Sequence, residues 1–374
     1  MERSEQTALE NAQFQVKKSM FSNGRLVEMP VETMTIADGE VLVKMEKFAY
    51  TANNITYAVA GDRMGYWQFF PAMGEGAHAY GVIPVWGFAT VVASKADGIP
   101  VGDRLFGYFP PASHLKMTPT RVKDYSFVDG AVHRSKLPAG YNRYQRVSAE
   151  RDYHPSMDNA RMMLSPLYLT SFFIWDALQD QDWHGAEQVI ILSASSKTSI
   201  GLGYALQADK MAPKVIGITS ARNLEFVKRL DLYGQSISYD AIGEIDLTIP
   251  TVIVDMSGNT DVLSALHTAL GDNMKWCVKV GLTHWDKAAL EPDQGIITER
   301  SEFFFAPAQI QQRIKEWGPT AFHQKTAAFM QETASKTQEW LTFRRVNGLA
   351  EMAKLHSAVC EGKVPANEGL IVEL

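Results

Sequence analysis

The pattern of apolar and polar residues changes near residue 155 of this 374-residue chain. Before that point, short apolar stretches such as VLVKMEKF (41–48) and FATVVAS (88–94) are separated by closely spaced Gly and Pro, which is typical of strands joined by turns. After it, strand-like and helix-like stretches alternate from 189–193 to 276–281. The predicted fold class is therefore α/β, with a small irregular β-barrel followed by a doubly wound parallel sheet.

Residues 111–155 form the least regular part of the chain and are rich in Tyr, Arg, His and Lys. Long irregular segments inside compact proteins tend to cover functional sites or to link domains. We expect this segment to cover the active site. The last stretch, 301–374, shows helical patterns at about 307–317, 320–343 and 347–361, followed by the apolar strand GLIVEL.

Composition excludes several classes of protein. A hydrophobic fraction of 46% and a charged fraction of 21% are ordinary for a soluble globular protein, and a net charge of −6 argues against nucleic acid as a partner. Cys277 and Cys360 are too few for a disulfide framework and suit a reducing compartment. The chain shows no signal peptide and no apolar run long enough to span a membrane, so we expect a cytoplasmic protein.

The stretch VIILSASSKTSIGLGYAL (189–206) has the pattern of a buried strand, a turn and a helix, an arrangement that can bind phosphate at the helix N-terminus. Its turn carries serines and a lysine in place of the usual glycines. Hydroxyl, ammonium and backbone N–H groups all donate to phosphate, which makes candidates of Ser195, Ser196, Lys197 and Thr198. The alternative is an ordinary polar turn in which a Ser or Thr caps the helix.

The next predicted strand, KVIGITSARNLEFVKRL, bears on the choice of cofactor. In dinucleotide-binding domains an acidic residue after this strand binds the ribose of NAD, whereas basic and hydroxyl residues accommodate the 2′-phosphate of NADP. This chain has Thr219, Ser220 and Arg222 there and no Asp or Glu, which favours NADP(H). The alternative for Arg222 is a solvated side chain at the start of a helix.

Several segments, in order and spacing, resemble the medium-chain dehydrogenase/reductase superfamily, in its zinc-free quinone-oxidoreductase-like branch, and within that branch the DUF2855 family. They include DGEVLVKMEKFAYTANN, GIPVGDRLFGYF, VIILSASSKTSIGLGYAL, TVIVDMSGNTDVLSAL and HSAVCEGKVPANEGLIVEL. The resemblance implies a GroES-like catalytic domain at 1–155 and 301–374. It also implies a Rossmann-type NADP-binding domain at 156–300.

Zinc-dependent members of the superfamily carry a Cys in an early loop and a Gly-His-Glu in a second one. At those places this chain has Thr51 and Val85-Trp86-Gly87, and neither Thr nor Trp is a good zinc ligand. We therefore expect no catalytic metal, and hydrogen-bond donors must stabilise the charge that develops on a substrate oxygen.

The stretch from Asn53 to Gly61 resembles the quinone-reductase pattern Val-Asn-Pro-x-x-Thr-Tyr-x-x-x-Gly, with one residue fewer. The match implies that Asn53 and Tyr57 line the nicotinamide pocket and that Tyr57 donates to the substrate oxygen. The alternative for Tyr57 is a core residue whose hydroxyl is bonded to the backbone.

Other cofactor-binding residues are also carried over from the family. Ser165-Pro166 has the pattern of a helix start, and Thr170 in that helix matches a position beside the nicotinamide, although a buried helical threonine more often bonds its own preceding carbonyl. Tyr239 resembles a tyrosine near the adenosine phosphate. Ser257-Gly258 and Val280-Gly281 follow later strands, where the ribose and carboxamide of the cofactor are expected.

These observations favour an NADPH-dependent, zinc-independent oxidoreductase that transfers hydride to an enone, quinone or ketone. The aromatic residues of 57–80 and 108–153 suggest that this small-molecule substrate is apolar or aromatic. The alternative function is a non-catalytic NADP(H)-binding sensor or scaffold. Related enzymes often pair through an edge strand, so we expect a homodimer, with KWCVKVGL (275–282) as the candidate edge.

Overall fold

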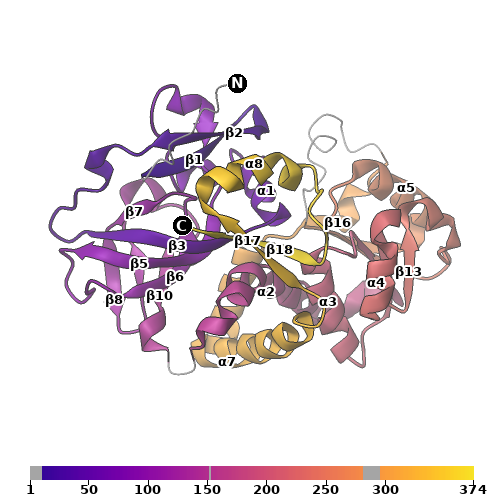
Figure 1. Cartoon of the computed structure of the whole chain (residues 1–374). Helices are drawn as coiled ribbons and strands as arrows, with labels where there is room; N and C mark the ends of the chain where they lie inside the picture. The colour runs from indigo at the N-terminus through magenta and orange to yellow at the C-terminus, as the bar shows by residue number, and fades with distance from the viewer. Residues whose placement is uncertain (1–10, 151–152, 281–294) are drawn as a thin grey trace, which may run out of the picture. The chain divides into compact units, whose positions relative to one another are not determined.

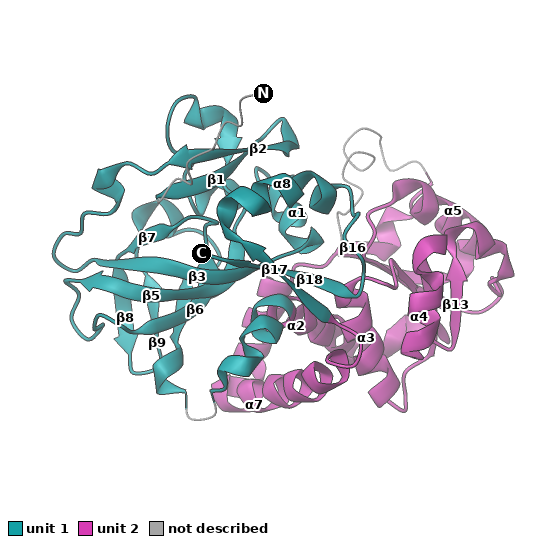
Figure 2. Ribbon diagram, in the orientation of Figure 1, with its two compact units in different colours: residues 1–163, 342–374 teal, residues 164–341 magenta. Residues whose placement is uncertain are grey.

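The chain folds into two compact units, coloured teal and magenta in Figure 2. The computed structural model describes residues 11–150, 153–280 and 295–374. Unit 1 comprises residues 1–163 and 342–374, and unit 2 comprises residues 164–341. The family resemblance implied boundaries at 155 and 300, and the observed division differs from these most for residues 301–341, which belong to unit 2.

Unit 1 is built on an extended sheet in the order β17-β18-β3-β5-β6-β10-β9-β8, with β7 also paired to β3 (Figure 1). The two strands predicted first are β3 and β5, which pair antiparallel as direct neighbours. The strands of this sheet are β3 (Val41–Tyr50), β5 (Val85–Ser94), β6 (Arg104–Phe109), β7 (His114–Met117), β8 (Pro119–Lys123), β9 (Ser126–Asp129), β10 (Arg143–Arg146), β17 (Thr342–Asn347) and β18 (Glu368–Glu373).

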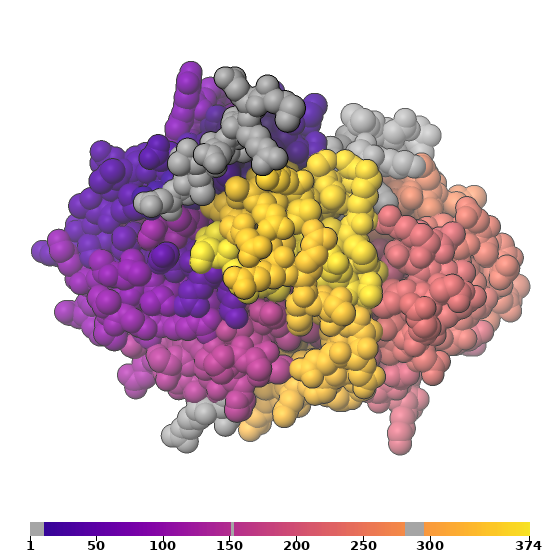
Figure 3. All heavy atoms as spheres, viewed as in Figure 1, coloured from indigo at the N-terminus to yellow at the C-terminus, as the bar shows by residue number. Residues whose placement is uncertain are grey.

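A smaller sheet in the order β2-β1-β4 completes the β-structure of unit 1. Its strands are β1 (Ala12–Lys17), β2 (Met20–Glu28) and β4 (Tyr80–Gly81). Helix α8 (Gly348–Cys360) packs on β1 and β2, and the space-filling view shows its yellow surface against the indigo N-terminal part (Figure 3). The C-terminal segment is therefore part of the same core as the first strands.

Residues 111–155 are more regular than the sequence suggested. The expectation of an irregular segment is wrong, because this stretch supplies β7, β8, β9 and β10 to the large sheet. The aromatic rings of Phe127 and Tyr144 are fully buried and stack with centroids 5.6 Å apart. Much of the aromatic content of the segment therefore belongs to the core of unit 1.

Unit 2 contains a parallel sheet in the order β13-β12-β11-β14-β15-β16. This order confirms the doubly wound fold class, and its direction reverses between β11 and β14, where such folds bind ligands. The strands are β11 (Gln188–Leu192), β12 (Lys214–Thr219), β13 (Gln235–Ser238), β14 (Thr251–Asp255), β15 (Met274–Lys279) and β16 (Ser301–Phe303). The helices that alternate with them are α3 (Lys197–Ala208), α4 (Leu224–Leu230) and α5 (Thr260–Leu270).

The strand expected to form a dimer edge lies inside this sheet. β15 pairs with β14 on one side and with the short strand β16 on the other, so the expectation that 275–282 forms an edge is wrong. The last two residues of that stretch lie outside the described residues. Among the described strands of this parallel sheet, β13 and β16 are the edges.

The helix predicted to start at Ser165-Pro166 begins earlier. Helix α2 (Asp158–Asp180) runs through Pro166, which therefore lies in the helix interior and not at its first turn. Helix α7 (Ala306–Thr337) joins two of the predicted helices, with a break at Gly318, whose φ is +76°, just before Pro319. Among the helices that the structure describes, none is long and apolar enough to cross a membrane.

A buried ion pair stabilises the segment between β9 and β10. The Arg134 guanidinium, which is 1% exposed, donates to the Asp129 carboxylate and to the Tyr144 hydroxyl, the latter at 3.0 Å. The other oxygen of Asp129 accepts from the backbone N–H groups of Thr118 (3.0 Å) and Ala131 (3.1 Å). Asp129 therefore neutralises a buried charge and also closes two turns.

We predict that Asp129→Ala lowers the free energy of unfolding by about 3–5 kcal/mol, because it leaves the Arg134 charge buried without its counter-ion. Urea unfolding followed by circular dichroism measures this change. The control is Glu225→Ala, which breaks the exposed pair with Lys228 (3.3 Å) and is expected to cost about 0–1 kcal/mol. Equal, small losses in the two variants would contradict the assignment.

Candidate active site

The loop after β11 has the geometry of an anion site. Ser193 has a left-handed φ of +59°, and its carbonyl accepts from the Ser196 N–H at 2.8 Å, which closes the turn. Ser196 is the N-cap of α3, because its hydroxyl accepts from the Ser199 N–H at 3.1 Å. The first N–H groups of a helix have no partner within it. Ser196 therefore caps the helix, as the alternative for this loop had it. The same helix N-terminus is the one that the sequence analysis proposed for phosphate binding.

Ser195 links this loop to the end of the neighbouring strand. Its hydroxyl oxygen accepts from the Thr219 hydroxyl and from the Asn223 side-chain amide, both at 3.0 Å. The sequence analysis did not single out Asn223, since nothing in the local pattern shows that the two turns meet. Ser195 is 7% exposed, so its main observed role is to hold the two loops together.

Lys197 and Thr198 open helix α3. The Thr198 carbonyl accepts from the Ser171 hydroxyl of α2 at 2.7 Å, which fixes the first turn of α3 against α2. Thr170, the preceding residue of α2, donates its hydroxyl to the Pro166 carbonyl at 2.9 Å. The local bond that the sequence analysis gave as the alternative for Thr170 is therefore the one that forms.

The end of β12 carries hydroxyl and basic side chains. The Ser220 hydroxyl is buried and has no hydrogen-bond partner within the described part of the chain. Arg222 is exposed two residues later, in the short turn of 221–223, and Thr219 to Asn223 include no acidic residue. A buried hydroxyl without a partner beside an exposed guanidinium fits the phosphate expected at this strand end.

Tyr239 directly follows β13 and reaches the same loop. Its hydroxyl oxygen accepts from the Ser193 N–H at 3.0 Å. Burial raises the pKa of Tyr239 to about 12, against the opposing effect of that N–H, so the phenol is neutral at physiological pH. The structure thus brings together residues that follow three strands, β11, β12 and β13, and that the sequence analysis proposed separately.

Residues after β14 and β15 form another part of this edge. Asp255, the last residue of β14, accepts from the Ser257 N–H and hydroxyl, both at 2.7 Å, and from the Gly258 N–H at 3.1 Å. Gly258 has a φ of +64°, which favours glycine. The Val280 N–H donates to the Asp255 carbonyl at 2.9 Å, and Gly281 lies outside the described residues. Asp255 orders this loop and was missed, although an Asp that ends an apolar strand before Ser-Gly is a recognisable turn signal.

In unit 1, helix α1 (Ala52–Val59) positions both predicted catalytic residues. Asn53 and Tyr57 lie one turn apart, and the Asn53 amide donates to the Tyr57 hydroxyl at 3.1 Å. The Trp86 indole N–H, from β5, donates to the same oxygen at 3.3 Å. Tyr57 is 6% exposed, so it is buried as the alternative had it, but its hydroxyl bonds side chains and not the backbone. Burial raises its pKa, and the two N–H donors partly offset that rise.

Aromatic side chains surround Tyr57. The rings of Tyr66, Tyr108 and Tyr141 lie with centroids 4.8, 5.4 and 6.4 Å from that of Tyr57. The hydroxyls of Tyr66 and Tyr141 are hydrogen-bonded at 3.2 Å. The Tyr108 hydroxyl is also buried, and its interaction with Tyr57 acts to lower the pKa of Tyr57. The cluster is apolar with a few hydroxyl donors, a surface that suits a flat, weakly polar molecule.

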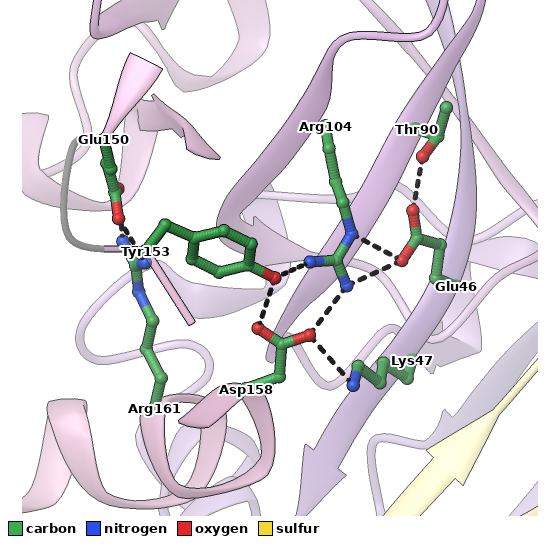
Figure 4. A network of polar contacts seen from close by, with 8 residues as sticks. All are labelled: Glu46, Lys47, Thr90, Arg104, Glu150, Tyr153, Asp158 and Arg161. Carbon is green, nitrogen blue, oxygen red and sulfur yellow. Dashed lines mark hydrogen bonds and ion pairs between the residues drawn. The ribbon is translucent and has the colours of Figure 1, made fainter. Parts of the chain in front are cut away.

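A second polar cluster lies in a cleft of about 760 Å³ in unit 1 (Figure 4). Arg104 pairs with Glu46 (2.8 Å) and with Asp158 (2.9 Å), and Lys47 also reaches Asp158 at 3.0 Å. Burial acts to raise the pKa of Asp158, but its bonds with Arg104, Tyr153 and Lys47 hold that pKa below the usual value. These ion pairs anchor the first residue of α2 to β3 and β6, and none of the predicted site residues lines the cleft.

The two positions where zinc-dependent relatives carry ligands serve other purposes here. Thr51 is the N-cap of α1, and Trp86 donates to Tyr57. Within the residues that the structure describes, no group of three or more His, Cys, Asp or Glu side chains could hold a metal ion.

Solved structures share this fold. CurA from Vibrio vulnificus, solved alone and in complex with NADPH, is 15% identical, with a TM-score of 0.63 over 97% of this chain and 98% of CurA. Mycobacterial Rv1454c, solved in complex with NADPH, is 15% identical, with a TM-score of 0.54 over 97% of this chain and all of its own. An alcohol dehydrogenase superfamily protein from Novosphingobium aromaticivorans is 16% identical, with a TM-score of 0.50 over 97% and 99% of the two chains.

The fold is thus the one shared by these three proteins. Residues 48–365 match the family described as "Protein of unknown function (DUF2855)", which covers most of the chain. This protein belongs to that family, and the predicted resemblance is confirmed. No curated protein matches the sequence.

We predict that Ser193→Val lowers the free energy of unfolding by about 1–2 kcal/mol relative to Ser193→Gly, because the φ of +59° disfavours a β-branched side chain. Urea unfolding of both variants measures the difference. The same two substitutions at Ser238, where φ is −83°, should rank in the opposite order, since Val suits extended backbone better than Gly. A Val variant at 193 as stable as the Gly variant would refute the strained turn.

Proposed function

We propose that this protein is an NADPH-dependent, metal-independent oxidoreductase that transfers hydride to an enone, quinone or ketone. One observation carries the proposal. The capped N-terminus of α3 follows β11, the strand at which the order of the parallel sheet reverses. It meets the end of β12, which carries hydroxyl and guanidinium groups and no carboxylate. This combination suits a dinucleotide with a 2′-phosphate. The NADPH bound in CurA and Rv1454c, which share the fold, supports the same cofactor.

The residues of unit 2 divide the cofactor between them in this proposal. The start of α3, with Ser195, Ser196, Lys197 and Thr198, binds the pyrophosphate. Ser220 and Arg222 bind the 2′-phosphate, since the buried Ser220 hydroxyl lacks a partner within the described residues. Tyr239 and the 257–258 loop line the adenosine and ribose side. Bound NADPH supplies the hydride.

Tyr57 stabilises the substrate oxygen in this proposal. Its oxygen accepts two N–H groups, from Asn53 and Trp86, so its own proton remains available to donate outward. Its raised pKa keeps that proton in place. A donor aimed at an oxygen that gains negative charge lowers the barrier for hydride addition. For an enone this oxygen becomes an enolate, and for a ketone an alkoxide.

The physiological setting is also part of the proposal. Cys277 is buried, and burial raises its pKa to about 12, so it remains a thiol, as suits a reducing cytoplasm. A homodimer remains our proposal, with pairing at β13 or β16, the edge strands of the described sheet, in place of β15.

We predict that Arg222→Ala raises the Kd for NADPH about 10- to 100-fold and leaves the Kd for NADH unchanged. A charge-assisted hydrogen bond to the 2′-phosphate is worth about 1.5–3 kcal/mol, and only NADPH has that group. Isothermal titration calorimetry with each nucleotide measures both constants. The matched control is Arg229→Ala, an exposed arginine one helix turn or more further along, which should bind NADPH like the wild type. Equal losses for both nucleotides would contradict NADP selectivity.

We predict that Tyr57→Phe lowers kcat about 10²- to 10³-fold and leaves NADPH affinity unchanged, because it removes a donor to the developing oxyanion. Stopped-flow oxidation of NADPH by a panel of enones, quinones and ketones provides the rates. Since the pKa of Tyr57 is raised above 10, the donor stays protonated and its contribution should persist at least to pH 10. Binding of NADPH without turnover of any acceptor would instead support the sensor.

A further inference from the structure

We propose that Trp86 is a positioning residue for Tyr57, and that its indole N–H directs the phenol proton toward the substrate oxygen. This inference rests on the proposed function, because it assigns the source of Tyr57's orientation within the same site. A phenol oxygen that already accepts from Asn53 and Trp86 has little capacity left to accept, so the hydroxyl acts as a donor. Trp86 was noted in the sequence only as a residue that cannot bind zinc.

The packing of Trp86 fixes the direction of its N–H. The indole ring stacks on Phe106, with centroids 5.8 Å apart and an interplanar angle of 29°. It also contacts the rings of Tyr108 and Tyr141, with centroids at 5.2 and 6.1 Å. A ring held on several sides cannot turn its N–H away from Tyr57 without repacking its neighbours. The bond at 3.3 Å is therefore imposed on Tyr57 by the sheet.

A second set of bonds holds helix α1 to the strand that carries Trp86. The Asn54 side-chain amide, 3% exposed, donates to the Pro84 carbonyl just before β5 at 2.8 Å. The Asn54 side-chain oxygen accepts from the Thr51 N–H at 2.7 Å, and the Thr51 hydroxyl accepts from the Asn53 N–H at 3.2 Å. This capping box orders the start of α1, and the bond from Asn54 to Pro84 ties it to the residue just before β5. The distance between Tyr57 and Trp86 is thereby set from both ends.

Both positions that hold zinc ligands in related enzymes thus contribute to one hydroxyl group. Thr51 caps the helix that carries Asn53 and Tyr57, and Trp86 completes the hydrogen bonds of the phenol. In this chain they orient a neutral donor.

The test is a double-mutant cycle with Trp86→Phe and Tyr57→Phe. Trp86→Phe keeps an aromatic ring and removes the N–H, so we expect kcat to fall about 5- to 10-fold while KM and the Kd for NADPH change less than twofold. The acceptor is whichever of 2-cyclohexenone and 1,4-benzoquinone the wild type reduces faster with NADPH. In the Tyr57→Phe background, Trp86→Phe should have no further effect, because its action passes through the Tyr57 hydroxyl. Additive losses would show a purely structural role and overturn the inference.

The matched control is Trp340→Phe in unit 2. The Trp340 indole N–H donates to the Tyr204 hydroxyl at 2.8 Å, so this variant removes the same kind of bond away from the proposed site. We expect it to keep the wild-type kcat. A loss equal to that of Trp86→Phe would show that removal of any indole–tyrosine bond slows the enzyme, and would overturn the inference.

An NMR measurement separates this inference from the proposed function. The indole Nε1–H resonance of Trp86 should shift upfield in Tyr57→Phe, while that of Trp340 stays unchanged. An unmoved Trp86 resonance overturns the inference whatever the activity. A shifted resonance in a protein whose wild type reduces no member of the panel of enones, quinones and ketones overturns the proposed reductase and leaves the orienting bond established.

Discussion

The meeting of parallel strand ends at one edge of a sheet is the constraint on which the rest of unit 2 depends. β11 pairs in register with β12 and β14, so the turns that follow these strands must converge. Ser195 bonds to Thr219 and Asn223 because of that convergence, and the Ser193 N–H finds Tyr239 for the same reason. Serines can then stand where glycines are usual, since the strain at one left-handed residue is offset by bonds from two neighbouring turns.

Much of the fold could be predicted because its signals are local. Alternating stretches identified β3 and four strands of the parallel sheet, β11, β12, β14 and β15. The resemblance to the quinone-reductase pattern singled out Asn53 and Tyr57, which the structure places one turn apart on α1. Asn223 and the role of Trp86 could not be predicted in this way. Each acts through a partner or a turn whose position depends on the folded chain, as when Trp86 meets a tyrosine 29 residues away.

The incorrect predictions have physical reasons of the same kind. Pro166 looked like a helix start because proline is common in the first turn of a helix, but α2 begins at Asp158 and continues through it. Residues 111–155 looked irregular because their strands are short and the exposed face of β8 is polar. The strand at 275–282 looked like an edge because its partner β16 has only three residues, too few to leave a pattern.

In the proposed mechanism a supported phenol takes the part that zinc has in zinc-dependent enzymes, and this changes what the site can do. A zinc ion stabilises an oxyanion by its charge, whereas Tyr57 offers one neutral hydrogen bond, so its orientation matters more. Two N–H donors on the phenol oxygen polarise its O–H bond and strengthen it as a donor, while burial keeps the proton from leaving. Such a group stabilises negative charge without giving up its proton. In this proposal the product must take its proton from another group, and the hydrogen-bonded hydroxyls of Tyr66 and Tyr141 lie in the aromatic cluster beside Tyr57.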